Sequence, residues 1–284
     1  MMPGRGSSQP SGGDPGRGAR RKRGISPVVA AVIMTSIMLT VVAVAIYYST
    51  SLIGMNRQMM EYENAKGLLT YAATALEQVA FGTGGARYIR FSLASTRINF
   101  EYRVETLRVK VNGIEVAEAT HNPGRIVVCG GNLVATAPRL LYPENSTLGA
   151  LEHALGKLVV GPGESIVVVY ENFTGAACSF LETYRVRVVY NGNISVMEEG
   201  FKRNYDFYTV HVLKMTFGYT GGSGTIPVVF RNVQEIVVER RTSSPVTLTV
   251  ELGSRQYNVQ LPGRLGADGS VVIVKITQVQ VSTV

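Results

Sequence analysis

The sequence predicts an α+β protein, with a long N-terminal hydrophobic α-helix followed by an antiparallel β-sandwich-like head. Three observations carry this prediction. No charged residue occurs between Arg23 and Arg57. Beyond Arg57, apolar residues continue at helical spacing to about residue 80. From Arg87 onward, short runs rich in Val, Ile and Tyr alternate with Asn-Gly, Gly-Gly and Pro-Gly turns.

The first part of the helix has the length of a membrane span. Residues 27–48 are 22 uncharged residues, and at ~1.5 Å per residue they form a helix of roughly 33 Å, enough to cross the hydrocarbon core of a bilayer. Ser26 is a favourable N-cap, and Pro27 suits the first helical position because its missing N–H has no partner there. The sequence therefore predicts a helix start at Ser26 and Pro27.

Charge sets the expected orientation. Residues 1–24 hold six basic residues and one acidic residue, which leaves 22 basic and 19 acidic residues in the remainder, a net charge of +3. Basic flanks stay cytoplasmic, so the C-terminal bulk is expected outside the cell. The excess of basic residues lies partly in residues 1–24, the expected leader, and we expect no nucleic-acid partner.

The junction between leader and helix resembles a known processing signal. Lys22-Arg23-Gly24 followed by Ile25-Ser26-Pro27-Val28-Val29 is similar to the class III signal peptide of archaeal type IV pilins and related surface-filament subunits. The resemblance covers roughly residues 20–55. Bacterial pilins carry a glutamate at the fifth mature position, where this chain has Val29, as archaeal members commonly do.

The resemblance implies a processing site at Arg23, Gly24 and Ile25, where a prepilin peptidase cuts after Gly24. It implies that the precursor sits in the cytoplasmic membrane with its head outside. A pilus assembly ATPase and a platform protein then build a homopolymeric filament at the cell surface, used for adhesion.

Helix packing in such a filament needs small residues, because lipid is as apolar as leucine and burial alone gives no gain. The first half of the helix offers a set of small side chains, Ala30, Ala31, Thr35, Ser36, Thr40, Ala43 and Ala45. A plain membrane anchor would not need them, and this alternative stays open.

The helix is expected to continue beyond the membrane as an amphipathic helix, with one apolar face. Ala65, Leu68, Leu69, Ala72, Leu76 and Val79 recur at intervals of three and four residues. Glu63, Lys66, Thr70, Thr74, Glu77 and Gln78 lie between them and are expected on the polar face. Gly54 is the expected place for a bend, and Gly82, Gly84 and Gly85 for the end.

The predicted organisation is a leader at residues 1–24, a helix at 25–80 divided into a membrane or filament-core part (25–54) and an amphipathic part (55–80), and a β-rich extracellular head at 81–284. About ten strands are expected in the head, with a short helix at residues 148–155. The glycine-rich stretch near residue 220 either divides the head into two domains or connects two strands of one domain.

Residues for catalysis or metal binding are few. His121, His153 and His211 share no metal-ligand spacing, and the aspartates are equally scattered. Glu182 and the pair Glu198-Glu199 are expected on a solvated strand face rather than in a glycosidase site. We therefore predict no enzyme activity, no cofactor and no metal site.

Two features are consistent with an extracellular head. Cys129 and Cys178 are the only cysteines, and they either form a disulfide or stay as buried thiols. Asn145, Asn172 and Asn193 each begin an Asn-X-Ser/Thr sequon for N-glycosylation. About two such matches are expected by chance in this composition, so the sequons alone carry little weight.

Three functional hypotheses follow. The first is a filament subunit, polymerised through its N-terminal helix. The second is a signal-anchored extracellular β-domain protein, with a binding or scaffold role, that does not polymerise. The third, an anchored hydrolase, requires a set of catalytic residues that the sequence does not display.

Overall fold

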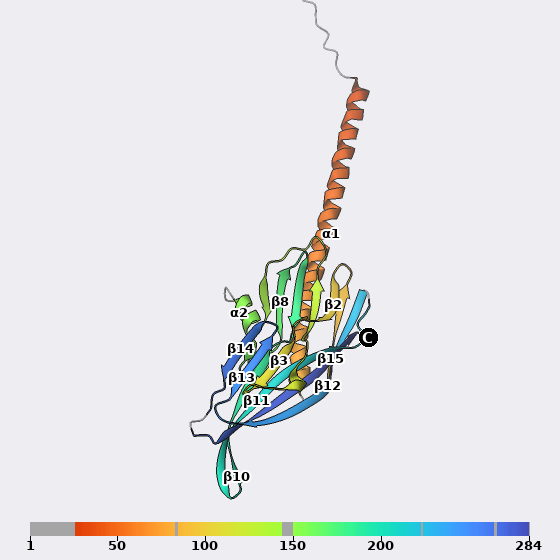
Figure 1. Cartoon of the computed structure of the whole chain (residues 1–284). Helices are drawn as coiled ribbons and strands as arrows, with labels where there is room; N and C mark the ends of the chain where they lie inside the picture. Colours follow the sequence, from red (N-terminus) through yellow and green to blue (C-terminus); the bar gives the residue numbers. More distant parts are fainter. Residues whose placement is uncertain (1–25, 83–84, 144–149, 223, 264–265, 284) are drawn as a thin grey trace, which may run out of the picture. The chain divides into compact units, whose positions relative to one another are not determined.

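The computed structural model describes residues 26–82, 85–143, 150–222, 224–263 and 266–283. The chain divides into two compact units, one ending at Ser51 and one beginning at Leu52. A single helix, α1 (Pro27–Phe81), runs through the boundary without interruption, so Gly54 does not end it. The rest of the described chain is β-rich, which confirms the predicted α+β class (Figure 1).

The largest sheet of the head has six strands in the order β1 (Ala86–Leu93), β12 (Gly224–Thr242), β15 (Gly269–Thr283), β11 (Phe201–Phe217), β10 (Val186–Glu198) and β7 (Val159–Val160). Most neighbours are antiparallel, but β11 pairs with β15 in parallel from Tyr205↔Gly269 to Phe217↔Val281. β7 pairs with β10 in parallel as well. The sheet is therefore mixed rather than purely antiparallel.

A five-stranded sheet has the order β2 (Arg97–Tyr102), β5 (Gly124–Cys129), β9 (Ala177–Glu182), β8 (Val168–Phe173) and β6 (Arg139–Tyr142). A four-stranded sheet has the order β14 (Arg255–Gln260), β13 (Thr247–Leu252), β3 (Leu107–Val111) and β4 (Ile114–Glu115). A one-turn 3₁₀ helix, η1 (Ala117–Ala119), follows β4. The short helix expected near residues 148–155 is α2 (Ala150–Gly156).

The two ends of β15 contribute to two cores on opposite faces of the six-stranded sheet. Near the C-terminal end of β15, Val279 and Val281 pack in a core with the second half of α1 and with residues of the five-stranded sheet. Toward the start of β15, Val272, Val274 and Ile276 pack in a second core with the four-stranded sheet. Because side chains alternate between faces along a strand, these two sets point to opposite sides.

The second half of α1 is a core element of the head. Ala65, Leu69, Ala72, Leu76 and Val79 are all buried, and Leu68 packs against the same core while partly exposed. These are the positions that the helical spacing predicts, so the amphipathic continuation is confirmed. The helix ends at Phe81, where Gly82 donates its backbone N–H to the Gln78 carbonyl at 2.9 Å.

The residues on both sides of the glycine-rich stretch near 220 belong to one sheet. β11 ends at Phe217 and β12 begins at Gly224, and each pairs with β15. The C-terminal 15-residue strand β15 thus lies between two strands that precede it in the sequence.

Beyond the start of β15, the hairpin of β10 and β11 continues as a two-stranded ribbon (Figure 1). Its tip is the pair Glu199-Gly200, with φ angles of 51° and 87°. Positive φ at both central residues is the requirement of a two-residue turn whose twist matches the strands.

Candidate functional site

The most unusual surface of the protein is the first half of α1. Every residue from 26 to 53 is exposed, and large apolar side chains such as Val28 and Leu39 are each 71% exposed. We call residues 27–53 the apolar segment. Exposed apolar surface of this extent in a soluble protein marks an interaction site or a membrane contact, and α1 is long and apolar enough to cross a membrane.

The apolar segment begins at the predicted position. Pro27 is the first residue of α1, and the Ala30 backbone N–H donates to the Ser26 carbonyl at 3.0 Å. Arg23, Gly24 and Ile25, which the resemblance assigns to the processing site, lie outside the described residues.

The small residues of the apolar segment are all exposed, including Ala30 and Ala43. The hydroxyls of the two threonines among them are satisfied within the helix. The Thr35 hydroxyl donates to the Ala31 carbonyl at 3.0 Å, and the Thr40 hydroxyl donates to the Ser36 carbonyl at 2.9 Å. Since the hydroxyls need no water, these positions are compatible with lipid or with a packed helix.

The small residues do not form one stripe. At ~100° per residue, Ala31, Thr35 and Ala45 fall within a sector of about 80°, whereas Ser36, Thr40 and Ala43 fall on the opposite side of the helix. Two sides of the apolar segment therefore permit close approach of another helix.

The second half of α1, which we call the docked half because it packs in the core of the head, is held there by two glutamates, Glu61 and Glu77. Glu61 accepts hydrogen bonds from the backbone N–H groups of Ala94 (2.5 Å), Ser95 (2.8 Å) and Thr96 (3.0 Å) in the β1–β2 turn, and from the Ser95 hydroxyl at 2.7 Å. Burial raises the pKa of Glu61, but these donors outweigh it and lower the pKa to about 2. The ionised carboxylate thus clamps the turn to the helix.

Glu77 makes the matching contact about four and a half helical turns further along α1, at the segment that leads into β8. It accepts from the Ile166 N–H at 2.6 Å, the Val167 N–H at 3.2 Å and the Ser165 hydroxyl at 2.8 Å. The Arg187 guanidinium lies 3.6 Å from the same oxygen. Glu77 is therefore not on a free polar face, contrary to the sequence-based expectation.

Lys66 also departs from that expectation, since it is buried. Its Nζ lies 2.5 Å from Glu63 and 3.1 Å from Glu171, a buried residue of β8. A buried ammonium is tolerated only when paired, and here two carboxylates pair with it. The lysine was expected in solvent because helical spacing shows which face is apolar but not which polar side chains a neighbouring sheet covers.

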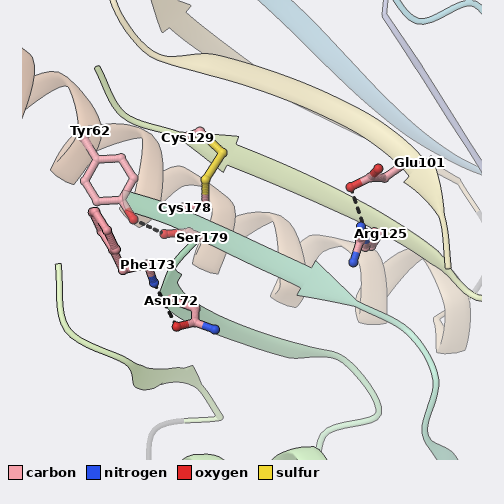
Figure 2. The surroundings of a disulfide bond; sticks show 8 residues. All are labelled: Tyr62, Glu101, Arg125, Cys129, Asn172, Phe173, Cys178 and Ser179. Carbon is pink, nitrogen blue, oxygen red and sulfur yellow. Dashed lines mark hydrogen bonds and ion pairs between the residues drawn. A yellow bond between two sulfur atoms is a disulfide. The ribbon is translucent and has the colours of Figure 1, made fainter. Parts of the chain in front are cut away.

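Cys129 and Cys178 are joined by a disulfide across the antiparallel strands β5 and β9, where they stand directly opposite each other (Figure 2). Ser179, the residue after Cys178, is completely buried and hydrogen bonds with the Tyr62 hydroxyl of α1 at 2.8 Å. Burial raises the pKa of Tyr62 to about 12. The disulfide thus lies beside a contact between the helix and the five-stranded sheet.

Two sequons fall on described residues. Asn172 is near the end of β8 and half-buried, beside the turn at residues 174–176, in which Thr174 and Gly175 are exposed. Asn193 lies within β10 opposite Asp206, and its Nδ2 atom is buried. Asn145 lies outside the described residues.

Among the described residues, His, Cys, Asp and Glu form no group of three that could hold a metal ion. Glu182 is completely buried, so its prediction as a solvated residue is wrong, whereas Glu199 is exposed as predicted. Burial raises the pKa of Glu182, against which Arg103 at 2.5 Å and Arg125 at 4.0 Å act. Arg103 in turn lies over the Tyr184 ring.

Glu198 belongs to a different cluster, where it pairs with Arg241 at 3.2 Å and accepts a hydrogen bond from Tyr205. Glu182 shares Arg103 with Glu105 and Arg125 with Glu101, and Glu198 shares Arg241 with Glu239. Both glutamates therefore take part in ion pairs with arginines.

No protein-family model, no curated protein and no solved structure matches this chain.

Proposed function

We propose that this protein is the subunit of an archaeal type IV pilus-like surface filament, held in the cytoplasmic membrane as a precursor and polymerised through its N-terminal helix. Its partners are further copies of itself, a prepilin peptidase, and the assembly ATPase and platform protein. Adhesion is the role that the family resemblance implies.

One observation carries the proposal: an exposed apolar helix continues without a break into the core of the head. Residues 27–53 are uncharged and exposed. From residue 62 the same helix is a core element with Tyr62, Leu69 and Leu76 almost completely buried. A membrane anchor needs the first half only, whereas a subunit that packs its helix into a fibre core needs the helix joined firmly to its head.

The length of the apolar segment supports the same function. Its 27 residues span roughly 40 Å, compared with ~30 Å for the hydrocarbon core of a bilayer. Met59 and Met60, which follow it on α1, are 48% and 73% exposed. A bilayer leaves part of this surface in water, while neighbouring helices in a fibre would cover all of it.

The two-sided distribution of small residues is the third support. A dimer of helices needs one close-packing face. In a helical assembly, each subunit contacts neighbours on different sides through head-to-tail interfaces that do not close. Ala31 and Thr35 on one side, and Ser36 and Ala43 on the other, provide two such faces.

The remaining candidate is a signal-anchored β-domain protein that never polymerises. The polar clamp of Glu61 on the β1–β2 turn is compatible with it, since it would also fix a head above a membrane. This candidate predicts no contact between apolar segments of different copies.

The test is N-terminal sequencing of the protein in sheared and pelleted cell-surface material. We expect fibres whose subunits start at Ile25. As a matched control, Gly24→Val should block cleavage, keep the full-length chain in the membrane fraction and remove it from the fibres. An intact leader on wild-type protein, found in the membrane and absent from fibres, would favour the non-polymerising anchor.

A further inference from the structure

We propose that Asn172 is a site of N-linked glycosylation in the folded head, and that Asn193, whose sequon is equally complete, is not. The proposal rests on the extracellular location of the head in the proposed function. It follows from how differently the fold presents the two asparagines.

The Asn172 sequon lies at an uncovered end of the five-stranded sheet. β6 pairs with β8 only as far as Arg139↔Glu171, so Asn172 and Phe173 extend beyond that neighbour. Phe173 is 54% exposed, and Thr174, which supplies the hydroxyl of the sequon, is exposed in the turn to β9. The second and third sequon positions are therefore exposed, and Asn172 itself is half-buried beside them.

The carboxamide of Asn172 is held so that its nitrogen is available. Its Oδ1 accepts the Phe173 backbone N–H at 2.8 Å, which leaves Nδ2 as the arm of the carboxamide that does not face this backbone group. Figure 2 shows the carboxamide pointing away from Tyr62 and Ser179. The glycan would thus project away from the helix–sheet contact.

The hairpin that carries Asn172 is tied to β5 close to its turn. Asn172 stands opposite Cys178 across β8 and β9, and Cys178 is tied to Cys129 of β5 by the disulfide. The sequon therefore stays on the surface once the head has folded, and attachment of a sugar there displaces no core residue.

Asn193 is also half-buried and is followed by exposed Ile194 and Ser195, but its amide nitrogen is covered. It lies inside the paired part of β10 and β11, one residue after the bulge between Tyr190 and Gly192. Its Nδ2 has less than 1 Å² of accessible surface and no hydrogen-bond partner among the described residues. A glycosyl group at this nitrogen would require the ribbon to open.

The reaction needs a lipid-linked oligosaccharide phosphate or diphosphate as donor, and a membrane transferase. A bond forms between Asn172 Nδ2 and the anomeric carbon of the first sugar, while the bond from that carbon to the phosphate oxygen breaks. The amide nitrogen loses one proton, and the lipid phosphate leaves with the bonding electron pair.

The test is mass mapping of the tryptic peptides of the full-length protein purified from its native host. Cleavage after Lys157, Arg185, Arg187 and Lys202 places the two sequons on separate peptides, residues 158–185 for Asn172 and 188–202 for Asn193. We expect the first peptide to carry a glycan mass and the second to have its unmodified mass. The same digest, run without reductant, reports whether Cys129 and Cys178 are joined.

Variants make the assignment specific. Asn172→Gln and Thr174→Ala should each remove one complete glycan from the intact mass, and Asn193→Gln should leave the glycan unchanged. An unmodified Asn172 in a protein with an intact disulfide would overturn this proposal while leaving the filament function standing, as would equal modification of Asn193. Glycosylated Asn172 on a chain absent from fibres would keep the site and contradict the filament function.

Discussion

At the scale of single residues, the charged side chains of the docked half of α1 act as acceptors for backbone groups of the head. Glu61 receives three N–H groups from one turn, and Glu77 receives two from the strand entering β8. Backbone donors that are buried without a partner cost free energy comparable to a lost hydrogen bond. These glutamates therefore link the helix and the sheets by satisfying groups that neither satisfies alone.

The Glu61 clamp predicts a defined loss of stability in acid. Its carboxyl has a pKa near 4.5 when unfolded and about 2 when folded, so its contribution is complete above pH 4.5 and is lost as the pH falls through 2. Glu61→Gln should lower the stability at pH 7 by about 1 to 2 kcal/mol, since a partly exposed carboxylate is screened by water. It should also flatten the change of Tm between pH 4.5 and 2.

The measurement is a series of thermal unfolding curves of both proteins in detergent between pH 2 and 7. Glu199→Gln is the control, because Glu199 is exposed at the tip of the β10–β11 hairpin and its removal should leave the Tm unchanged. Equal acid sensitivity in Glu61→Gln and wild type would contradict the clamp.

At the scale of elements, α1 joins two kinds of surface in one helix. Its first half has no buried residue, and its second half has ten. The first half is uniform in polarity, so its contacts with other helices depend on the size of the side chains rather than on their hydrophobicity.

Ala31→Phe therefore separates membrane insertion from assembly. The added ring makes the segment no less apolar, so the amount of protein in the membrane fraction should stay at the wild-type level. It removes a site of close approach, so fibres should be lost or reduced at least tenfold. Immunoblots of the membrane and sheared fractions measure both quantities.

Ile37→Phe provides the matched control for Ala31→Phe. Ile37 is already a larger side chain, is 58% exposed, and lies about 240° from Ala31 around the helix, outside both groups of small residues. Fibres at the wild-type level from both variants would show that Ala31 is not a packing position.

The disulfide ties two strands of the five-stranded sheet, with 49 residues of sequence separation between its cysteines. A crosslink over a loop of this length stabilises a protein by roughly 2 to 4 kcal/mol, mainly by restricting the unfolded chain. The double substitution Cys129→Ala and Cys178→Ala should lower the free energy of unfolding by that amount. Denaturant titration of the variant and of reduced wild type should give the same midpoint, and a midpoint equal to that of oxidised wild type would contradict the prediction.

At the scale of the whole molecule, the last strand of the chain completes both cores. β15 lies between β11 and β12, contributes Val279 and Val281 to the core around α1, and contributes Val272, Val274 and Ile276 to the core beneath the four-stranded sheet. The head therefore has no complete core until the C-terminal residues are in place.

A chain that ends at Asp268 should fail to form a cooperatively folded head, because two long strands would each lose a neighbour and both cores would lose their central residues. Near-UV circular dichroism and thermal unfolding measure this loss. The control is a chain in which residues 196–203 are replaced by Asn-Gly. This change shortens the ribbon of β10 and β11, which beyond Tyr205 pairs only with itself, and should leave the cooperative transition in place.

Sequence patterns predicted some elements well and missed others for identifiable reasons. The start of α1 at Pro27 and the buried positions of its second half follow from local chemistry and helical period. β11 has no single alternation of polar and apolar residues, because its 17 residues begin as an exposed ribbon and end as a buried strand. β9 does not look like a buried strand in sequence, since its six buried residues include Ser179 and Glu182.

The sequence by itself determined the apolar segment, the helix start, the one-faced continuation and the β-rich character of the head, because these depend on side-chain polarity at a fixed local period. Only the tertiary structure decided that Lys66 and Glu182 are buried, that β15 inserts between earlier strands, that Cys129 faces Cys178, and that the Nδ2 atom of Asn193 is buried. Each of these depends on which distant segment lies opposite a residue. That pairing is set by the packing of whole sheets, and no local pattern along the chain encodes it.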